Sequence, residues 1–397
     1  MFKSNQPASI VTAMLPTGVS RRVIAEVLQP AGFGALIWQA RGTLLKDNWL
    51  QKYLPPISPA KKILQVLLPD NAVDSMMDAV IECANLHKQA TGAVYSQPCN
   101  DVFVGKDFLN WQVSDTLPAD NSQHRFSADL SLIVCIVDRA RSDRIARAAV
   151  AAGAHGPVIH LCEGRGLRDR LGWLRITKQY EKDVLWVMTP AAESDQIFQS
   201  MTQAGELHLP GRGFMYQTDI HKGLFNLPSL MSNRYYAANV QQIIRAIDHL
   251  TGHAHWRDGA LQNIGSGAGS AGLAAPSQSI LTDQYCLSAV VRRHEHPALV
   301  DLLLDNGAKG VNFTFGRLEE AQAAQTPTVA GAQIADQYGV INSVSDAATI
   351  ARMAAAIEDS ASAAGIDDVL AYVNPVERVA TYVYQPGRRD YREQQVA

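Results

Sequence analysis

The chain has 397 residues, of which 47% are hydrophobic and 18% charged, and its formal net charge at pH 7 is −3. This composition excludes a globally disordered protein, and the balance of 35 basic and 38 acidic residues argues against a nucleic-acid-binding protein. The most apolar run, 130–137, is too short to cross a bilayer, and the N-terminus lacks the form of a signal peptide. Five scattered cysteines without CxxC spacing argue against a disulfide framework or a zinc knuckle. We therefore expect a cytoplasmic protein without direct membrane insertion.

One sequence pattern recurs along the chain. Residues 31–42 parallel 152–166, so that Arg41-Gly42 matches Arg165-Gly166, and both pairs are followed by Trp-Leu after six residues. A more diverged third copy matches 307–317 to 153–165, with two residues deleted. A string of such matches in the same order indicates an internal repeat.

The second copy shows the predicted elements most clearly. Apolar runs of strand length alternate with stretches that have the periodicity of an amphipathic helix, and Gly153 follows the first helix, where a left-handed C-cap is wanted. The order is βαββαβ, which is typical of a ferredoxin-like α+β domain. The predicted elements are a strand at 130–137, a helix at 143–152, a strand at 158–162, a loop opening at Gly164, a strand at 184–188, a helix at 192–204 and a strand at 214–218.

Between the second and third copies lies a longer insertion. It contains a predicted helix at 239–250 and a glycine-rich run, 265–272, with a formal GxGxxG at Gly267–Gly272. A phosphate-binding loop needs a strand before it and a helix directly after it, so the flanks favour a flexible linker over a dinucleotide site. The predicted organisation is a first domain at 8–105, a linker at 106–128, a second domain at 129–224, a helix with a Gly/Ser-rich linker at 225–283, a diverged third domain at 284–387 and a tail at 388–397.

The strand at 130–137 is apolar at nearly every position, which indicates that both of its faces are buried. Three sheets packed face to face around a pseudo-threefold axis would bury those faces within one chain. We therefore expect three ferredoxin-like (βαββαβ) domains arranged as an intramolecular pseudo-trimer, and a chain that is a monomer in solution.

Several local motifs resemble the PII signal-transduction family and its PII-like relatives. They are a loop opening at Gly-Arg after the second strand, the segment Glu181-Lys182-Asp183 before the third, a glycine-rich connection at 209–214, and Pro375-Val376-Glu377 after the last strand of the third copy. PII proteins are trimers that bind adenine nucleotides in the clefts between subunits and act on a transporter, an enzyme or a regulator. The resemblance covers most of 8–105, 129–224 and 284–387, and implies three tandem PII-like domains.

The resemblance also implies which residues bind the effector. Glycine turns present adjacent backbone N–H groups, and arginine binds phosphate with two parallel hydrogen bonds. The implied effector-binding residues are Gly164, Arg165, Gly166, Gly211, Arg212 and Gly213 in the second copy, Arg41, Gly42, Thr43, Lys88 and Gly92 in the first, and Gly316 and Arg317 in the third.

The resulting functional expectation is a non-enzymatic PII-like regulator. It would sense a small anionic effector (an adenine nucleotide, a small carboxylate or bicarbonate) and control a partner, for which a membrane transporter or its associated complex is a candidate. Trp49 and Trp173, in the presumed projecting loops, either contact this partner or pack their loops onto the body. The alternative is a structural or adaptor protein that keeps the trimeric shape without a ligand. No catalytic motif and no convincing metal site is found, although His249 and His253 have i, i+4 spacing.

Overall fold

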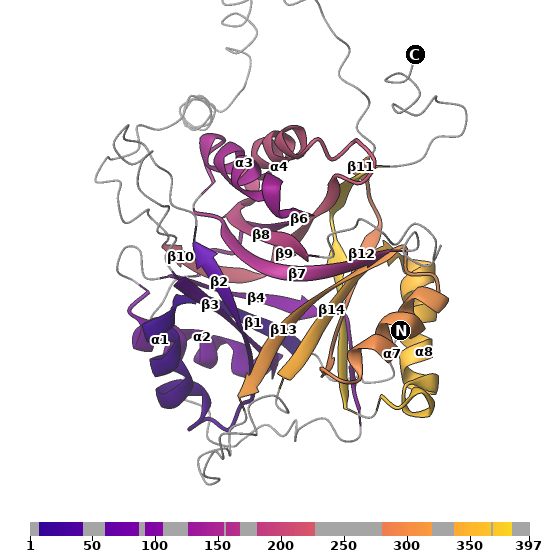
Figure 1. The fold of residues 1–397 in the computed structure, drawn as a ribbon. Helices are drawn as coiled ribbons and strands as arrows, with labels where there is room; N and C mark the ends of the chain where they lie inside the picture. Colours follow the sequence, from indigo (N-terminus) through magenta and orange to yellow (C-terminus); the bar gives the residue numbers. More distant parts are fainter. Residues whose placement is uncertain are drawn as a thin grey trace, which may run out of the picture. The chain divides into compact units, whose positions relative to one another are not determined.

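The computed structural model describes residues 8–42, 60–86, 92–105, 126–154, 156–166, 181–226, 280–319, 337–366 and 368–382, all of which belong to one compact unit. The predicted helix at 239–250 and the Gly/Ser-rich run at 265–272 lie outside these residues. The described residues form a mixed α+β structure with six α-helices and antiparallel strand pairings (Figure 1).

Three segments of the chain share the order strand, helix, strand, strand, helix, strand, and each then adds a short fifth strand. The first segment contains β1 (Ala8–Pro16), α1 (Thr17–Val23) with a π-helical continuation (Ile24–Leu28), β2 (Ala35–Gly42), β3 (Ala60–Pro69), a 3-10 turn (Asp70–Ala72), α2 (Val73–Ala84), β4 (Gly92–Cys99) and β5 (Asp101–Val104). The second contains β6 (Leu130–Asp138), α3 (Arg139–Ala151), β7 (Val158–Gly166), β8 (Glu181–Pro190), α4 (Ala191–Gly205), β9 (Gly213–Ile220) and β10 (Lys222–Asn226). The third contains β11 (Ile280–Leu281), β12 (Gln284–Arg292), α7 (His296–Asp305), β13 (Gly310–Glu319), β14 (Gln337–Asp346), α8 (Ala347–Ser360), a 3-10 turn (Ser362–Ala364), β15 (Val369–Val376) and β16 (Arg378–Thr381).

The expected elements of the second segment are present, with two differences at their ends. Helix α3 begins at Arg139, four residues before the predicted start, because Asp138 still has extended backbone and ends β6. The expected loop opening at Gly164 is wrong, because β7 continues through Gly166, and residues 163–166 pair with β13. A sequence pattern confined to one repeat could not reveal a pairing partner that comes from another repeat.

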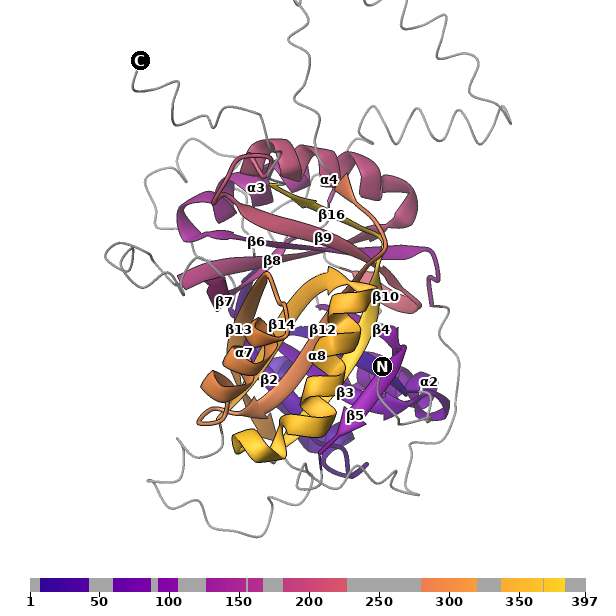
Figure 2. The same ribbon diagram turned by 90° about the vertical axis from the view of Figure 1, so that its right-hand side faces the viewer.

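Within each segment the four main strands have the same order. The sequence of neighbours is β4-β1-β3-β2 in the first, β9-β6-β8-β7 in the second and β15-β12-β14-β13 in the third. Two interleaved split βαβ units produce this order. Both helices of a segment lie on one face of its strands, as α7 and α8 do in Figure 2.

The short fifth strands pair with the sheet of another segment. β10 of the second segment pairs with β4 of the first, β5 of the first pairs with β15 of the third, and β16 of the third pairs with β9 of the second. The exchange is therefore cyclic, and each segment gives one strand and receives one.

The opposite edges of the three sheets pair in a second cycle. The end of β2 pairs with the start of β7, the end of β7 with the start of β13, and the end of β13 with the start of β2. We call these the first, second and third junctions. Both edges of every four-stranded unit are thus hydrogen-bonded to another segment, which removes the edges that invite aggregation.

The hydrophobic side chains divide into one shared core and three separate ones. Each segment packs its helices on the outer face of its own strands, around residues such as Met76, Ile197 and Met353. The inner faces of all three sheets contribute to a single further cluster that contains Met14, Ile136 and Val290. The expectation that strands such as β6 are buried on both faces is thus explained, since helices cover one face and the other segments cover the second.

Three tyrosines occupy the same register in the three segments. Tyr95, Tyr216 and Tyr372 lie opposite Thr12, Val134 and Ser288 of their own first strands. On their other side they lie opposite a residue of the exchanged strand, namely Gly223, Val379 and Val102. This common register makes residues of the three segments comparable position by position.

Two further features concern the membrane and the thiols. Within the described residues, no helix combines the length and the apolar character needed to cross a membrane. All five cysteines are described, and all are free thiols.

The start of β9 gives a test of the backbone. Gly213 has φ +119°, and a Cβ there would lie 2.2 Å from the Ile136 carbonyl oxygen, whereas Gly211 has φ +75° and open space around it. We expect Gly213→Ala to lower the free energy of unfolding by at least about 2 kcal/mol, and Gly211→Ala by about 1 kcal/mol, because only the first adds a backbone clash to the cost of positive φ. Urea denaturation measures both, and equal losses would contradict the packing described for β9.

Candidate functional site

The three junctions place one equivalent residue each at the same register position. Arg41 lies opposite Ile159 at the first junction, Glu163 opposite Phe313 at the second, and Arg317 opposite Ile37 at the third. The partners Ile159, Phe313 and Ile37 are themselves equivalent, because they lie opposite Leu185, Ile341 and Leu64 of the neighbouring strands. The three junctions can therefore be compared residue by residue.

This register corrects the match between the Arg-Gly pairs at 41–42 and 165–166 that the sequence repeat indicates. Arg41 corresponds to Glu163 and not to Arg165, which lies two residues further along β7, opposite Val311 of β13. The sequence match aligned identical letters, whereas the strand pairing aligns positions with the same neighbours. The second segment therefore presents a carboxylate where the first and third present a guanidinium.

At the first junction the arginine is neutralised by the protein itself. The Arg41 guanidinium lies 3.2 Å from Asp143 Oδ1 and 3.3 Å from Asp183 Oδ2, and it crosses from the first segment to the second to do so. The Asp183 side chain is only 5% exposed, accepts a 2.5 Å hydrogen bond from Ser142 Oγ, and has Arg139 Nε 3.9 Å away. At the first junction, the arginine is thus already paired with carboxylates of the protein itself.

At the third junction the same three positions are all cationic. Strand and helix register make Arg317 equivalent to Arg41, Lys62 equivalent to Asp183, and Arg21 equivalent to Asp143. The helix alignment is supported by Ser20 and Ser142, which donate to carbonyl oxygens three residues earlier in the same way. Two carboxylates of the first junction are replaced by a lysine and an arginine.

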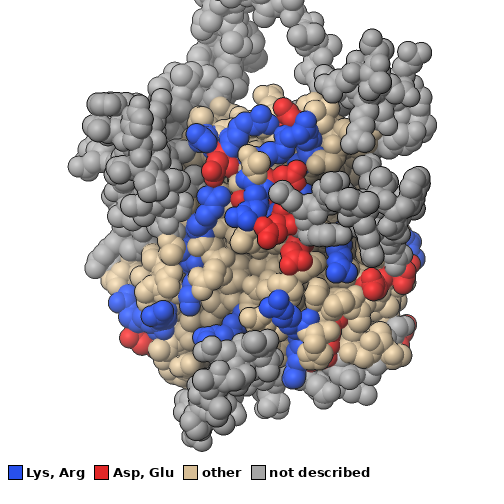
Figure 3. All heavy atoms as spheres, viewed as in Figure 1, with Lys and Arg blue, Asp and Glu red and all other residues tan. Residues whose placement is uncertain are grey.

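The replacement of two carboxylates by cations affects the pKa of Lys62. Burial lowers the pKa of Lys62 first, and the nearby positive charges of Arg317 and Arg21 lower it further. In Figure 3, basic side chains dominate the surface over α1 and the end of β13, whereas basic and acidic side chains are mixed over α3 and β8. We call Arg21, Lys62 and Arg317 the cationic triad.

The second junction has a different character. The positions equivalent to Asp143 and Asp183 are Pro297 and Gly339, so the described residues build no ion-pair network of that kind around Glu163. Instead, His296 packs against Phe313 and Phe315, with ring centroids 4.6 and 5.2 Å away, and Arg293 lies over the Phe315 ring. Burial is the main cause that lowers the pKa of His296, and the charge of Arg165 adds to it.

The predicted glycine-rich connections serve mainly to shape the backbone. Gly211 and Gly213 both have positive φ, and the Arg212 guanidinium between them lies 3.5 Å from the Glu206 carboxylate. Gly92 has φ +143° and lies so close to the Met14 carbonyl oxygen that a Cβ would be 2.5 Å from it. These glycines have structural reasons to be glycine that do not require a ligand.

The structure brings together some of the predicted residues and leaves others outside its described part. Gly42, Gly164, Arg165, Gly166 and Gly316 lie at the junctions. Thr43, Lys88, Trp49 and Trp173 lie outside the described residues. The prediction missed Arg21 and Lys62, although the pairs Arg21-Arg22 and Lys61-Lys62 were visible, because only the register shows that they replace aspartates.

The charged side chains at the junctions are suited to binding ions of opposite charge, and they form no recognisable catalytic arrangement among the described residues. Among the described residues, no group of three His, Cys, Asp or Glu side chains is arranged to hold a metal ion. A cluster of two guanidiniums and an ammonium is suited to phosphate or carboxylate oxygens, which accept charge-assisted hydrogen bonds from both cation types.

Comparison with known proteins adds little to this description. No protein-family model matches the chain, and no curated protein matches it. A similar solved structure is the ligand-free regulatory subunit of aspartate kinase from Thermus thermophilus, with 11% identity and a TM-score of 0.18 over 51% of this chain and 93% of that one. A likeness of this strength says nothing about the function of this chain.

The first junction yields a stability prediction. Arg41→Ala leaves the buried Asp183 carboxylate without its closest cation, and we expect the free energy of unfolding to fall by about 1–3 kcal/mol. Asp143 is 61% exposed, so Asp143→Ala should cost less than about 1 kcal/mol. Urea denaturation of both variants measures the difference, with Arg147→Ala, an exposed change on the same helix, as the control. Similar losses for Arg41→Ala and Arg147→Ala would contradict the proposed importance of the ion pairs.

Proposed function

We propose that this chain is an intramolecular pseudo-trimer of three PII-like domains and that it acts as a regulatory protein. The support is the cyclic character of both sets of pairings, in which the fifth strands and the three junctions each close a ring of three. The common register of Tyr95, Tyr216 and Tyr372 supports the same arrangement. A chain that supplies all three partners to itself needs no further copies.

The proposed regulatory signal is a small anionic effector bound at the third junction by the cationic triad. The observation that carries this proposal is the replacement of Asp143 and Asp183 by Arg21 and Lys62 at equivalent positions. At the first junction the protein's own carboxylates occupy the space beside the arginine. At the third junction an external anion would take the place of those carboxylates, as a phosphate or a small carboxylate can.

We propose binding rather than catalysis at this position. Arginine stays protonated throughout the physiological pH range and cannot act as a general base. A bound anion would instead bridge cations of the first and third segments, and so tighten their contact. Such a coupling between effector and domain contact is what a regulator of a transporter or an enzyme would need.

The anion proposal predicts a charge-specific loss of binding. We expect ATP, pyrophosphate, bicarbonate or 2-oxoglutarate to bind the wild type in isothermal titration, and Lys62→Ala to weaken the anion that binds by tenfold or more, since a charge-assisted hydrogen bond contributes about 1.5–3 kcal/mol. Lys309→Ala removes the same charge from an exposed turn before β13 and serves as the control, with affinity expected within twofold of wild type.

A double variant sharpens the same test. Arg21→Asp combined with Lys62→Asp rebuilds the first junction's charges at the third, so that Arg317 gains two carboxylate partners. This variant should keep or increase the stability of the wild type while losing anion binding altogether. Undiminished binding by the folded double variant would place the effector elsewhere, and no binding of any anion by wild type would favour the structural or adaptor alternative.

The lowered pKa of Lys62 adds a pH dependence. Sulfate keeps its charge over neutral and alkaline pH, so a change in its affinity reports on the protein. We expect sulfate affinity to fall at a lower pH than the usual lysine pKa of about 10.4 would produce, because burial and the neighbouring cations lower the pKa of Lys62 and its ammonium is lost earlier as the pH rises. Lys62→Arg should flatten this profile, since the guanidinium remains charged; an unchanged profile would exclude Lys62 from the site.

The pseudo-trimer itself predicts the mass of the particle. The exchanged strands satisfy the sheet edges within one chain, so light scattering should give a monomer of 43.2 kDa. A particle of about three times that mass would show that the strand exchange runs between chains.

A further inference from the structure

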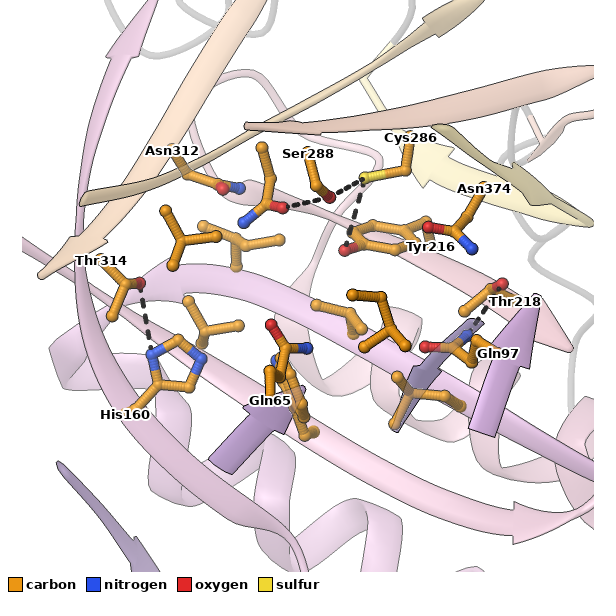
Figure 4. Close-up of a pocket in the computed structure, with 18 of the residues that line it drawn as sticks. Gln65, Gln97, His160, Tyr216, Thr218, Cys286, Ser288, Asn312, Thr314 and Asn374 are labelled. Atoms are coloured by element: carbon orange, nitrogen blue, oxygen red, sulfur yellow. Dashed lines mark hydrogen bonds between the residues drawn. The ribbon is translucent and has the colours of Figure 1, made fainter. Parts of the chain in front are cut away.

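A cavity of about 60 Å³ lies where the inner faces of the three sheets meet (Figure 4). Its walls come from strands of all three segments, and it is separate from the cationic triad, whose members lie on the helix-bearing side of the strands. The space suffices for a few water molecules or for one molecule of similar size.

At two positions of the wall the third segment is polar where the second is apolar, and at one of them, Asn312, the first segment is apolar as well. Asn312 of the third segment is equivalent to Leu36 of the first and Val158 of the second. Each lies two residues before a residue (Thr314, Trp38 and His160, respectively) that pairs with an equivalent position of the neighbouring strand. In the same way Ser288 replaces Val134 of the second segment. An apolar residue is therefore compatible with the fold at the position of Asn312, and burying an amide there is costly unless it finds a partner.

Two buried polar atoms in the lining have no hydrogen-bond partner within the described part of the chain. They are Nε2 of His160 and Nε1 of Trp38, in residues that are 6% and 4% exposed and whose ring centroids lie 5.8 Å apart. His160 Nδ1 lies 3.3 Å from the Leu161 carbonyl oxygen, which can only accept, and 3.4 Å from the Thr314 hydroxyl, which can accept as well. We assign the ring proton to Nδ1 on these two contacts, which leaves a lone pair on Nε2. The wall thus offers one N–H donor and one acceptor on two rings that are in contact.

The cavity is also electrically neutral. Its lining residues include no Asp, Glu, Lys or Arg. Burial lowers the pKa of His160 to about 4 and raises the pKa of the Cys286 thiol to about 11, so both are uncharged near pH 7. A charged molecule would lose its hydration without gaining a counterion, and is therefore disfavoured.

We propose that this cavity binds one small uncharged molecule that carries an amide or urea group. Such a planar group presents a carbonyl acceptor beside an N–H donor, which complements the Trp38 N–H and the His160 lone pair at once. Its remaining donors and acceptors can pair with Asn312 and Asn342, whose side chains offer the matching amide groups. The site is independent of the anion site proposed at the third junction.

The test uses three probes of nearly the same shape and different charge. Acetamide is neutral, acetate is an anion and acetamidinium is a cation. In protein labelled with ¹⁵N-tryptophan and ¹⁵N-histidine, the Trp38 indole signal (assigned with Trp38→Phe) and the His160 ring nitrogens report on the two free atoms directly. We expect acetamide to shift both signals in a saturable manner with roughly millimolar affinity, as befits so small a probe, and the two ions to have at least tenfold weaker effects.

Variants separate binding from folding. Asn312→Leu restores the residue type of the first segment, so it should fold normally and weaken acetamide at least tenfold; His160→Phe should do the same by removing the acceptor. Asn306→Leu, at the end of α7 and outside the cavity lining, is the control and should bind as wild type does. Absence of saturable shifts with acetamide, or equal binding of acetate or of glycerol, would overturn the proposal, the first outcome leaving a cavity that holds water only.

Discussion

The structure depends on one constraint, which is that the edges and the inner face of a four-stranded sheet cannot be left open. A segment of the type β1–β4 covers only one face of its sheet with its two helices. Taken alone, such a segment would leave its apolar inner face uncovered and the backbone groups of both edge strands unpaired. Each segment satisfies both needs through the other two, by exchanging a fifth strand at one edge and meeting a neighbour's strand at the other.

Because main-chain hydrogen bonds carry this arrangement, side chains at equivalent positions are free to differ. The strands at the three junctions pair in the same register, but the side chains beside them differ. They form an ion-pair network at the first junction, an aromatic cluster at the second and a group of three cations at the third. Divergence of this kind is difficult in a homotrimer, in which every substitution appears three times. A single chain can instead keep one junction closed by salt bridges and give another a different chemistry.

The same freedom explains the cavity on the inner faces. The apolar residues Leu36 and Val158 fill their share of the centre, whereas the third segment places the polar Asn312 there. A buried amide contributes to stability only when it is hydrogen-bonded. The His160 and Trp38 atoms that lack a partner among the described residues belong to the lining of the same space, so part of this polar lining is unsatisfied.

The sequence by itself determined the βαββαβ order of the second segment and the internal repeat, since local apolar periodicity and glycine positions depend on neighbours along the chain. It could not determine the fifth strands, whose four or five residues gain their structure from a partner segment. Nor could it align the junctions, because the identical Arg-Gly pairs at 41–42 and 165–166 differ by two positions in strand register. The roles of Arg21 and Lys62 were decided by tertiary structure alone, because the effect of a charge depends on the charges that the fold places beside it. Here one of those charges, Arg317, comes from more than 250 positions away in the chain.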